Sequence, residues 1–189
     1  MTGTPDWLPG KFGNGLNFVE ADSESAFIDG LPAYRATDSF TIAFWMNQNQ
    51  GYRNRPFESQ SILIFDYMFY SFGSPWDSTS MGFQSDSVWH HVVFSFDDPD
   101  KGKKVYVDAV VLESNQMFLS DTVLDGFYMK LGIHHDSYKR GGMFDDLAVW
   151  DRALTLDEVE SLVLFNEGEG RVVQEAEPIP SAGTMLMIK

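Results

Sequence analysis

Three acidic residues at alternate positions form the segment with the greatest catalytic potential. They are Glu20, Asp22 and Glu24, separated by Ala21 and Ser23. Alternate residues of a strand project to one side, and a retaining glycoside hydrolase uses two carboxyl groups about 5–5.5 Å apart. On a regular strand, however, the Cα atoms of Glu20 and Glu24 would lie about 13 Å apart. The polar neighbours favour a solvated turn, so we expect no hydrolysis by this segment.

Two pairs of adjacent histidines suggest a metal site at first sight. The pairs are His90-His91 and His134-His135. Adjacent residues of a strand point to opposite faces, so neither pair can chelate one ion jointly. We interpret these histidines as structural. The sequence has no Ser-His-Asp set, phosphate-binding loop or zinc spacing that stands out.

Aromatic and polar residues in predicted loops indicate a ligand-binding surface. A flat ring offers the C–H face of a sugar a large apolar contact, while neighbouring polar groups bind its hydroxyls. Gly73 and Pro75 favour a turn that holds Trp76, and binding residues concentrate in loops. Tyr67 lies in an aromatic strand segment, where core packing is the alternative role. The predicted ligand-binding residues are Tyr52, Arg53, Asn54, Arg55, Tyr67, Tyr70 and Trp76.

Composition limits the class of protein and the kind of partner. The chain has 189 residues, 43% of them hydrophobic and 15% aromatic, which suits one domain rich in strands. The net charge of −15 disfavours nucleic acids and anionic membranes, and it is compatible with neutral polymers and calcium. The absence of cysteine excludes disulfides and thiolate metal sites. No signal peptide or membrane-spanning run is recognisable, so we expect no membrane insertion by this chain.

Short apolar segments bounded by turn residues predict many strands. The predicted strands are 16–19, 25–28, 39–46, 60–72 as a pair or one bent strand, 88–96, 103–108, a return strand from Val110, 127–133 and 143–150. Residues 1–15 are predicted as an entry loop and 47–60 as a long loop. Thr155, followed by Glu158 at the spacing of a capping box, predicts one helix that ends near Asn166.

Four segments in order carry a family resemblance. They are 9–18 (PGKFGNGLNF), 39–45 (SFTIAFW), 89–108 (beginning WHHVVFSF and ending KVYVD) and 144–155 (FDDLAVWDRALT). Over residues 9–166 the chain resembles the concanavalin A-like lectin/glucanase superfamily, in its laminin-G-like group. The resemblance implies an all-β fold, a two-sheet antiparallel jelly-roll sandwich with one short C-terminal helix.

The same resemblance sets the expected domain boundaries. We expect the jelly-roll domain over residues 1–168 and an acidic, proline-containing tail or linker over 169–189. Domains of this type usually carry a further strand before the PGKFG segment, and here eight residues precede it. Either that first edge strand is absent, which would leave unpaired backbone groups, or the chain is part of a longer protein.

The resemblance also implies a structural calcium site between the loop after the first strand and the last strand. The matching residues are Asp22, Ser23 and Asp146. Calcium takes six to eight oxygen ligands, which carboxylates and backbone carbonyls supply. The alternative is that Asp22 and Ser23 are turn residues and Asp146 is a capping or surface carboxylate. Because Asp145 and Asp146 face opposite sides of a regular strand, only one of them can serve the site.

Three functional hypotheses follow. The first is a non-catalytic carbohydrate-binding or adhesion module of a secreted or cell-surface protein, with a glycan or polysaccharide as partner. The second is a protein-interaction or spacer domain in a surface assembly, with a surface protein as partner. The third is a hydrolase of the laminarinase type, which shares the fold and the spacing of Glu20, Asp22 and Glu24. In such enzymes apolar residues separate the acids, and the motif lies on a central strand. In this chain Ala21 and Ser23 separate the acids, and the segment follows the first predicted strand.

Overall fold

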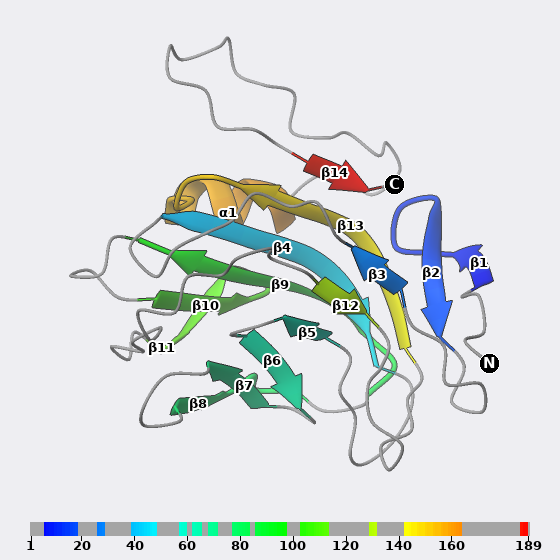
Figure 1. Cartoon of the computed structure of the whole chain (residues 1–189), viewed down its shortest axis with the longest axis horizontal. Helices are drawn as coiled ribbons and strands as arrows, with labels where there is room; N and C mark the ends of the chain where they lie inside the picture. The colour runs from blue at the N-terminus through cyan, green and yellow to red at the C-terminus, as the bar shows by residue number, and fades with distance from the viewer. Residues whose placement is uncertain are drawn as a thin grey trace, which may run out of the picture.

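Two antiparallel sheets face each other across an apolar core in the computed structural model of the chain (Figure 1). The structure describes residues 6–18, 26–28, 39–48, 57–59, 62–65, 68–71, 77–83, 86–97, 103–113, 129–131, 142–163 and 186–188. We call the eight-stranded sheet the large sheet and the six-stranded sheet the small sheet. This arrangement confirms the predicted all-β, two-sheet sandwich.

The strands of each sheet are far apart in sequence. The large sheet has the order β1 (Asp6–Pro9), β2 (Asn14–Phe18), β13 (Gly142–Trp150), β4 (Phe40–Asn47), β9 (Trp89–Phe96), β10 (Lys103–Val107) and β11 (Val110–Glu113), and β14 (Leu186–Ile188) pairs with β13. The small sheet has the order β3 (Ala26–Ile28), β12 (Met129–Leu131), β5 (Phe57–Ser59), β6 (Ile62–Phe65), β7 (Met68–Ser71) and β8 (Asp77–Ser80).

Alternation along β4 explains how the core forms. Phe40, Ile42 and Phe44 are fully buried between the sheets and pack with residues of the strands on either side. Phe40 stacks on Phe96 of β9 with ring centroids 4.2 Å apart. Ile64 contributes to the same cluster from the small sheet. Burying each of these side chains stabilises the fold by about 1.5–3 kcal/mol.

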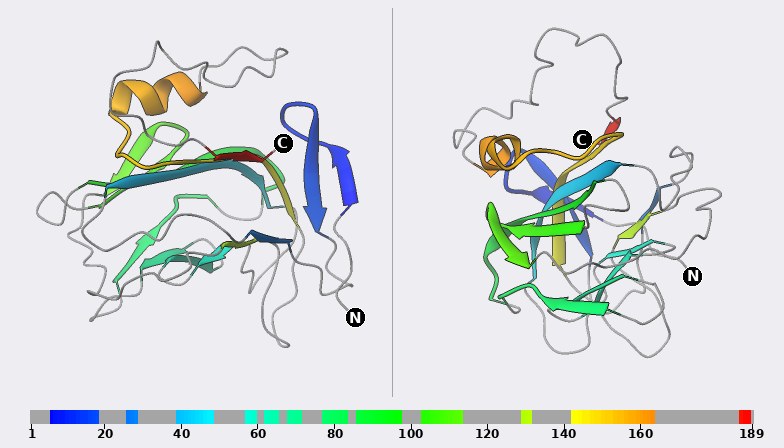
Figure 2. Two further views of the ribbon diagram at one scale, coloured as in Figure 1. Left: turned by 45° about the horizontal axis from the view of Figure 1, so that its top comes forward. Right: turned by 90° about the vertical axis from the view of Figure 1, so that its left-hand side faces the viewer.

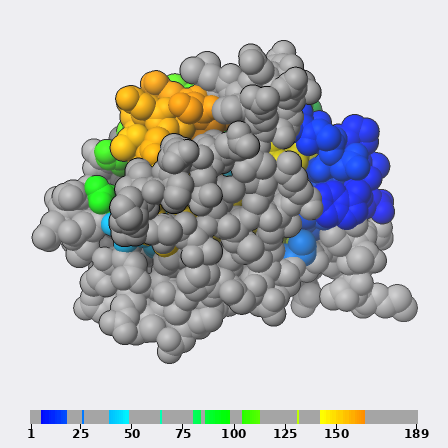
Figure 3. Space-filling view, turned by 90° about the horizontal axis from the view of Figure 1, so that it is seen from above, coloured from blue at the N-terminus to red at the C-terminus, as the bar shows by residue number. Residues whose placement is uncertain are grey.

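The opposite face of the large sheet carries the helix. α1 (Leu156–Val163) lies outside the sandwich, above the large sheet and away from the small one (Figure 2). Its Val159 is fully buried against Ala43 of β4 and Val93 of β9. In the space-filling view of this side, α1 and the β1–β2 hairpin lie at opposite ends (Figure 3). Within the ranges that the structure describes, no helix has the length and apolar character needed to cross a membrane.

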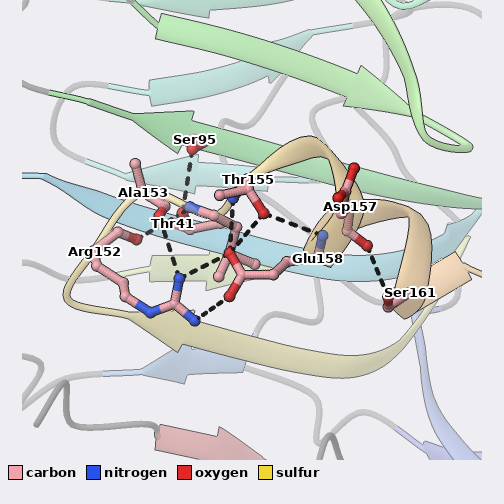
Figure 4. Close-up of polar contacts among 9 residues, drawn as sticks. Thr41, Ser95, Arg152, Ala153, Thr155, Asp157, Glu158 and Ser161 are labelled. Carbon is pink, nitrogen blue, oxygen red and sulfur yellow. Dashed lines mark hydrogen bonds and ion pairs between the residues drawn. The ribbon is translucent and has the colours of Figure 1, made fainter. Parts of the chain in front are cut away.

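The predicted capping box is confirmed. Thr155 Oγ1 accepts a hydrogen bond from the backbone N–H of Glu158 at 3.3 Å, and Glu158 Oε2 accepts one from the backbone N–H of Thr155 at 2.8 Å (Figure 4). This reciprocal pair satisfies two N–H groups that the first turn of a helix leaves without partners.

Four strands were not predicted from the sequence. β1 belongs to the predicted entry loop, β5 to the loop 47–60 and β14 to the predicted tail, while β8 begins at Asp77, the last residue of the predicted turn 73–77. β1 and β8 are the outer strands of their sheets, and β1 contains Pro9 while β8 is polar throughout. Edge strands tolerate such residues, so they lack the apolar alternation that identified the central strands.

Candidate functional site

Most of the predicted site residues lie outside the residues that the structure describes. These are the ligand residues Tyr52, Arg53, Asn54, Arg55, Tyr67 and Trp76, the calcium residues Asp22 and Ser23, the acids Glu20 and Glu24, and the pair His134 and His135. The backbone of Tyr70 is described: it lies in β7, opposite Leu63 of β6 and Ser78 of β8. Asp146, His90 and His91 are described with their side chains.

Strand register divides the predicted ligand segments into two groups. The segment that contains Tyr52–Arg55 joins the small sheet at Phe57, which pairs with Ile64, and the residue pair 66–67 connects Phe65 to Met68. These connection points share one end of the small sheet. Trp76 immediately precedes β8, whose first residue pairs with the last residue of β7, at the other end. The two ends are about 10 Å apart, three strand steps of roughly 3.3 Å.

A β-bulge sets the positions of Asp145 and Asp146. Asp145 pairs with Trp45, but the next paired residue of β13 is Ala148, which pairs with Ala43, so β13 has one residue more than β4 here. Asp146 adopts a left-handed backbone with φ of 47°. The expectation that Asp145 and Asp146 face opposite sides assumed a regular strand. The bulge interrupts that regularity, so strand alternation no longer determines which face Asp146 takes.

Asp145 holds the β1–β2 connection against the large sheet. Its Oδ2 accepts a hydrogen bond from the backbone N–H of Phe12 at 2.8 Å, and its Oδ1 accepts one from the N–H of Asp146 at 2.9 Å. Burial raises the pKa of Asp145, and the hydrogen bonds from Phe12, Asp146 and Lys11 only partly oppose this rise. A Cβ at Gly10 would meet Asp145 Oδ2 and lie 2.7 Å from the backbone nitrogen of Gly15, so this contact requires glycine.

The same connection covers Trp45 on the outer face of the large sheet. Phe12 meets Trp45 edge to face at 5.7 Å, and Lys11 Nζ lies 4.8 Å from the centroid of the Trp45 ring. Trp45 is therefore only 6% exposed, and its role is packing rather than sugar stacking. The ring of His91, 5.0 Å from Trp45, has a buried Nδ1 that bonds to no residue in the described part of the chain. Burial lowers the pKa of His91 to about 4, against an opposing effect of Asp108.

His90 lies between two carboxylates at the start of β9. Its Nδ1 is 2.7 Å from Asp108 Oδ2, its Nε2 is 3.1 Å from Asp86 Oδ2, and Phe83 stacks on the ring at 4.0 Å. Burial acts to raise the pKa of Asp86, but hydrogen bonds from the Val88 N–H and from His90 outweigh it, and the pKa lies below its ordinary value. The interpretation of adjacent histidines as structural missed this cluster, because Asp108 is 18 residues from His90.

The described residues fit a metal site only in part. They include no group of three or more His, Cys, Asp and Glu side chains placed to hold an ion. Asp86 and Asp108 contact different nitrogens of His90, so the three cannot share one metal. Of the predicted calcium ligands, Asp146 alone is described; it supplies the oxygen donor chemistry that calcium requires, at the bulge next to the β1–β2 connection.

Both faces of the central strands are occupied by packing. The inner faces of β4 and β9 belong to the main core, and their outer faces contact α1, Leu154 and the β1–β2 connection. In the described part of the large sheet, these two central strands therefore serve as a scaffold.

Comparison with known families identifies this scaffold. A family model described as the concanavalin A-like lectin/glucanases superfamily matches residues 22–160. The chain belongs to this superfamily. The family predicted from the four sequence segments is confirmed. Comparison with curated protein sequences finds no significant match.

Solved structures share the fold at low sequence identity. Domain 4 of AbnA, a GH43 extracellular arabinanase from Geobacillus stearothermophilus in complex with arabinotriose, aligns with a TM-score of 0.66 and 21% identity over 85% of this chain and 82% of that one. The binding domain of Paraclostridial Mosquitocidal Protein 1 aligns with a TM-score of 0.64 and 15% sequence identity, over 84% of this chain and 45% of that one. The ligand binding domain of botulinum neurotoxin serotype D, in complex with N-acetylneuraminic acid, aligns with a TM-score of 0.61 and 9% sequence identity, over 84% of this chain and 44% of that one. The chain thus spans less than half of either toxin domain.

Proposed function

We propose that this chain is a non-catalytic carbohydrate-binding module of a secreted or cell-surface protein. The observation that carries the proposal is the likeness, over 85% of the chain, to an arabinanase domain that was solved with arabinotriose. A second structure with the same fold was solved with N-acetylneuraminic acid.

The proposed glycan is neutral rather than acidic. The chain carries a net charge of −15, which disfavours an anionic sugar such as a sialic acid. A neutral sugar meets no such repulsion and gains affinity from apolar contact with aromatic rings and from hydrogen bonds to its hydroxyls. Neutral pentose and hexose oligosaccharides, with arabinotriose as the first probe, are therefore the class to test.

The proposed binding surface is formed by connections of the small sheet. Tyr52, Arg53, Asn54, Arg55 and Tyr67 belong to segments that join one end of this sheet, with Tyr70 in β7 between them and Trp76. Trp76 belongs to the other end. The residues at the two ends of the small sheet therefore need separate variants, because either end can bind a glycan without the other.

A glycan array with the full chain, followed by calorimetric titration, tests the proposal. Tyr52→Ala and Trp76→Ala are each expected to weaken binding about tenfold or more if the ring stacks on a sugar, since each 1.4 kcal/mol is a factor of ten. Trp7→Ala is the matched control, because Trp7 is 52% exposed on the edge strand β1 and lies outside the proposed surface. Absence of binding to every neutral glycan would refute the proposal.

One observation favours the alternative of a protein-interaction domain. Trp7 and Leu8 are 52% and 42% exposed on β1, the outer strand of the large sheet. Exposed apolar residues on an edge strand are suited to pairing with another chain. If Trp7→Ala abolishes binding to a surface protein and no glycan binds, this alternative replaces the first.

A further inference from the structure

The cluster around His90 has a geometry that depends on protonation. We call His90, Asp86 and Asp108 the His90 clamp. The ring faces the inner side of the large sheet, and its side chain is only 13% exposed. Each of its two nitrogens lies within hydrogen-bond distance of a carboxylate oxygen, 2.7 Å to Asp108 and 3.1 Å to Asp86.

An ionised carboxylate accepts hydrogen bonds but donates none, and a neutral imidazole carries a single N–H. Both contacts of the clamp can therefore be hydrogen bonds only when both ring nitrogens carry protons. We infer that the His90 clamp is a proton-controlled contact, closed when His90 is an imidazolium and opened at Asp86 when the ring loses its second proton.

The two arms of the clamp differ in how firmly they are held. Asp108 is fixed at the β10–β11 turn, where its Oδ1 accepts the N–H of His91 and its own N–H donates to the His91 carbonyl, both at 2.9 Å. The Asp86 arm is longer, and its carboxylate is otherwise held by the N–H of Val88 at 3.0 Å. A neutral ring keeps its remaining proton on Nδ1 toward Asp108, and its Nε2 lone pair then faces the Asp86 oxygen.

Opening of the Asp86 arm affects the segment before β9. Ser87 stays attached to the end of β4, because its N–H donates to the Gln48 carbonyl at 3.0 Å and its own carbonyl accepts from Asn47 Nδ2 at 3.0 Å. The change is therefore confined to Asp86 and Val88, whose side chain is 52% exposed. The clamp thus couples pH to the shape of one exposed connection and leaves the sheet in place.

No other charged group among the described residues contacts the ring. Phe83 stacks on one side, β4 places Met46 opposite His90, and His91 of the same strand points to the other face, where it contacts Trp45. Among the described residues, Asp86 and Asp108 are therefore the charged groups that decide how the ring is bonded.

Double-mutant cycles in the full chain test the inference. Thermal midpoints are measured at about pH 5.5 and about pH 8.5, on either side of the ordinary titration of imidazole and above that of aspartate. One cycle combines His90→Gln with Asp86→Asn, and the other combines His90→Gln with Asp108→Asn. Glutamine keeps a hydrogen-bond donor but does not titrate. Titration of His91 and of the unfolded chain cancels in each cycle.

We expect the coupling between His90 and Asp86 in the thermal midpoint to be a few degrees at the lower pH and near zero at the higher pH. The coupling between His90 and Asp108 should persist at both pH values. Equal His90–Asp86 coupling at the two values, or none at either, overturns the inference. If a variant does not fold, the amide NMR shifts of Ser87 and Val88 in the unmodified chain serve instead. They should follow the titration of the His90 ring, and shifts that do not move with it overturn the inference equally.

Discussion

Replacement of Thr41 by valine should destabilise the protein strongly, although the two side chains have nearly the same shape. Thr41 is fully buried in β4. Its hydroxyl donates to the carbonyl of Arg152 at 2.8 Å and accepts the N–H of Leu154 at 3.0 Å, with Ser95 Oγ 3.4 Å away (Figure 4). One hydroxyl thus satisfies two backbone groups in the connection from β13 to α1.

The size of the effect follows from these two groups. Thr41→Val leaves the Arg152 carbonyl and the Leu154 N–H without their partner. An unsatisfied buried group such as the Leu154 N–H costs about 1–3 kcal/mol, and the partly buried Arg152 carbonyl adds a smaller cost. Partial relaxation brings the expected loss to about 2–4 kcal/mol, a large part of an ordinary stability of about 5–15 kcal/mol. For a chain of this size that corresponds to a fall in melting temperature of roughly 5–15 °C.

Urea unfolding of the full chain measures this loss directly, with Thr41→Ser as the matched control. Serine keeps the hydroxyl and removes one methyl group, so it should cost about 1 kcal/mol. The m-value should stay unchanged, since the unfolded surface is the same. A loss below about 1 kcal/mol for valine, or a greater loss for serine than for valine, would contradict the argument that the hydroxyl anchors the helix connection.

Three further predictions concern charge and metal. The bidentate ion pair with Arg152 and the Thr155 cap lower the pKa of Glu158 to about 2. Because the pair is exposed, Glu158→Gln should cost only about 1 kcal/mol at neutral pH, and this cost should disappear as the pH falls below about 2, as acid titration of both proteins would show. Burial lowers the pKa of His91 to about 4, so the folded state keeps this ring neutral and the free energy of unfolding should fall by about 3 kcal/mol between pH 6.5 and 4. His91→Phe should remove this pH dependence, and an unchanged pH dependence in the variant would refute the assignment to His91. If calcium binds at the predicted site that includes Asp146, a chelator should lower the melting temperature reversibly. Asp146→Asn should abolish most of this chelator-dependent change, and a melting temperature that does not change when the metal is removed by chelator would exclude the site.

The sequence predicted the central strands and the helix well. β4 and β9 alternate clearly because one face of each belongs to the main core, and Thr155 and Glu158 identify the helix start through local chemistry. β1 and β8 were not predicted as strands, because an edge strand needs neither apolar alternation nor a continuous apolar face. The bulge at Asp146 was also missed, since an extra residue in one strand is defined only by its register with a partner.

The polar contacts were harder to predict than the strands. Asp145 was considered only as an alternative to Asp146, and its bond to Phe12 joins residues 133 positions apart. His90 was interpreted as structural, but its position between Asp86 and Asp108 depends on the packing of two connections, the segment before β9 and the β10–β11 turn. Sequence spacing gives no information on such contacts, because the fold alone brings these segments together.

The measurement that tests the proposed function most directly is a parallel glycan array of the unmodified chain, Tyr52→Ala, Trp76→Ala and the control Trp7→Ala. We predict binding of a neutral oligosaccharide by the unmodified chain and by Trp7→Ala, and its loss in at least one of the other two. The same glycan should release no reducing sugar, and Glu20→Gln should leave binding unchanged. Release of reducing sugar that disappears in Glu20→Gln and Glu24→Gln, or equal binding by all four proteins, would contradict a non-catalytic module that binds through the connections of its small sheet.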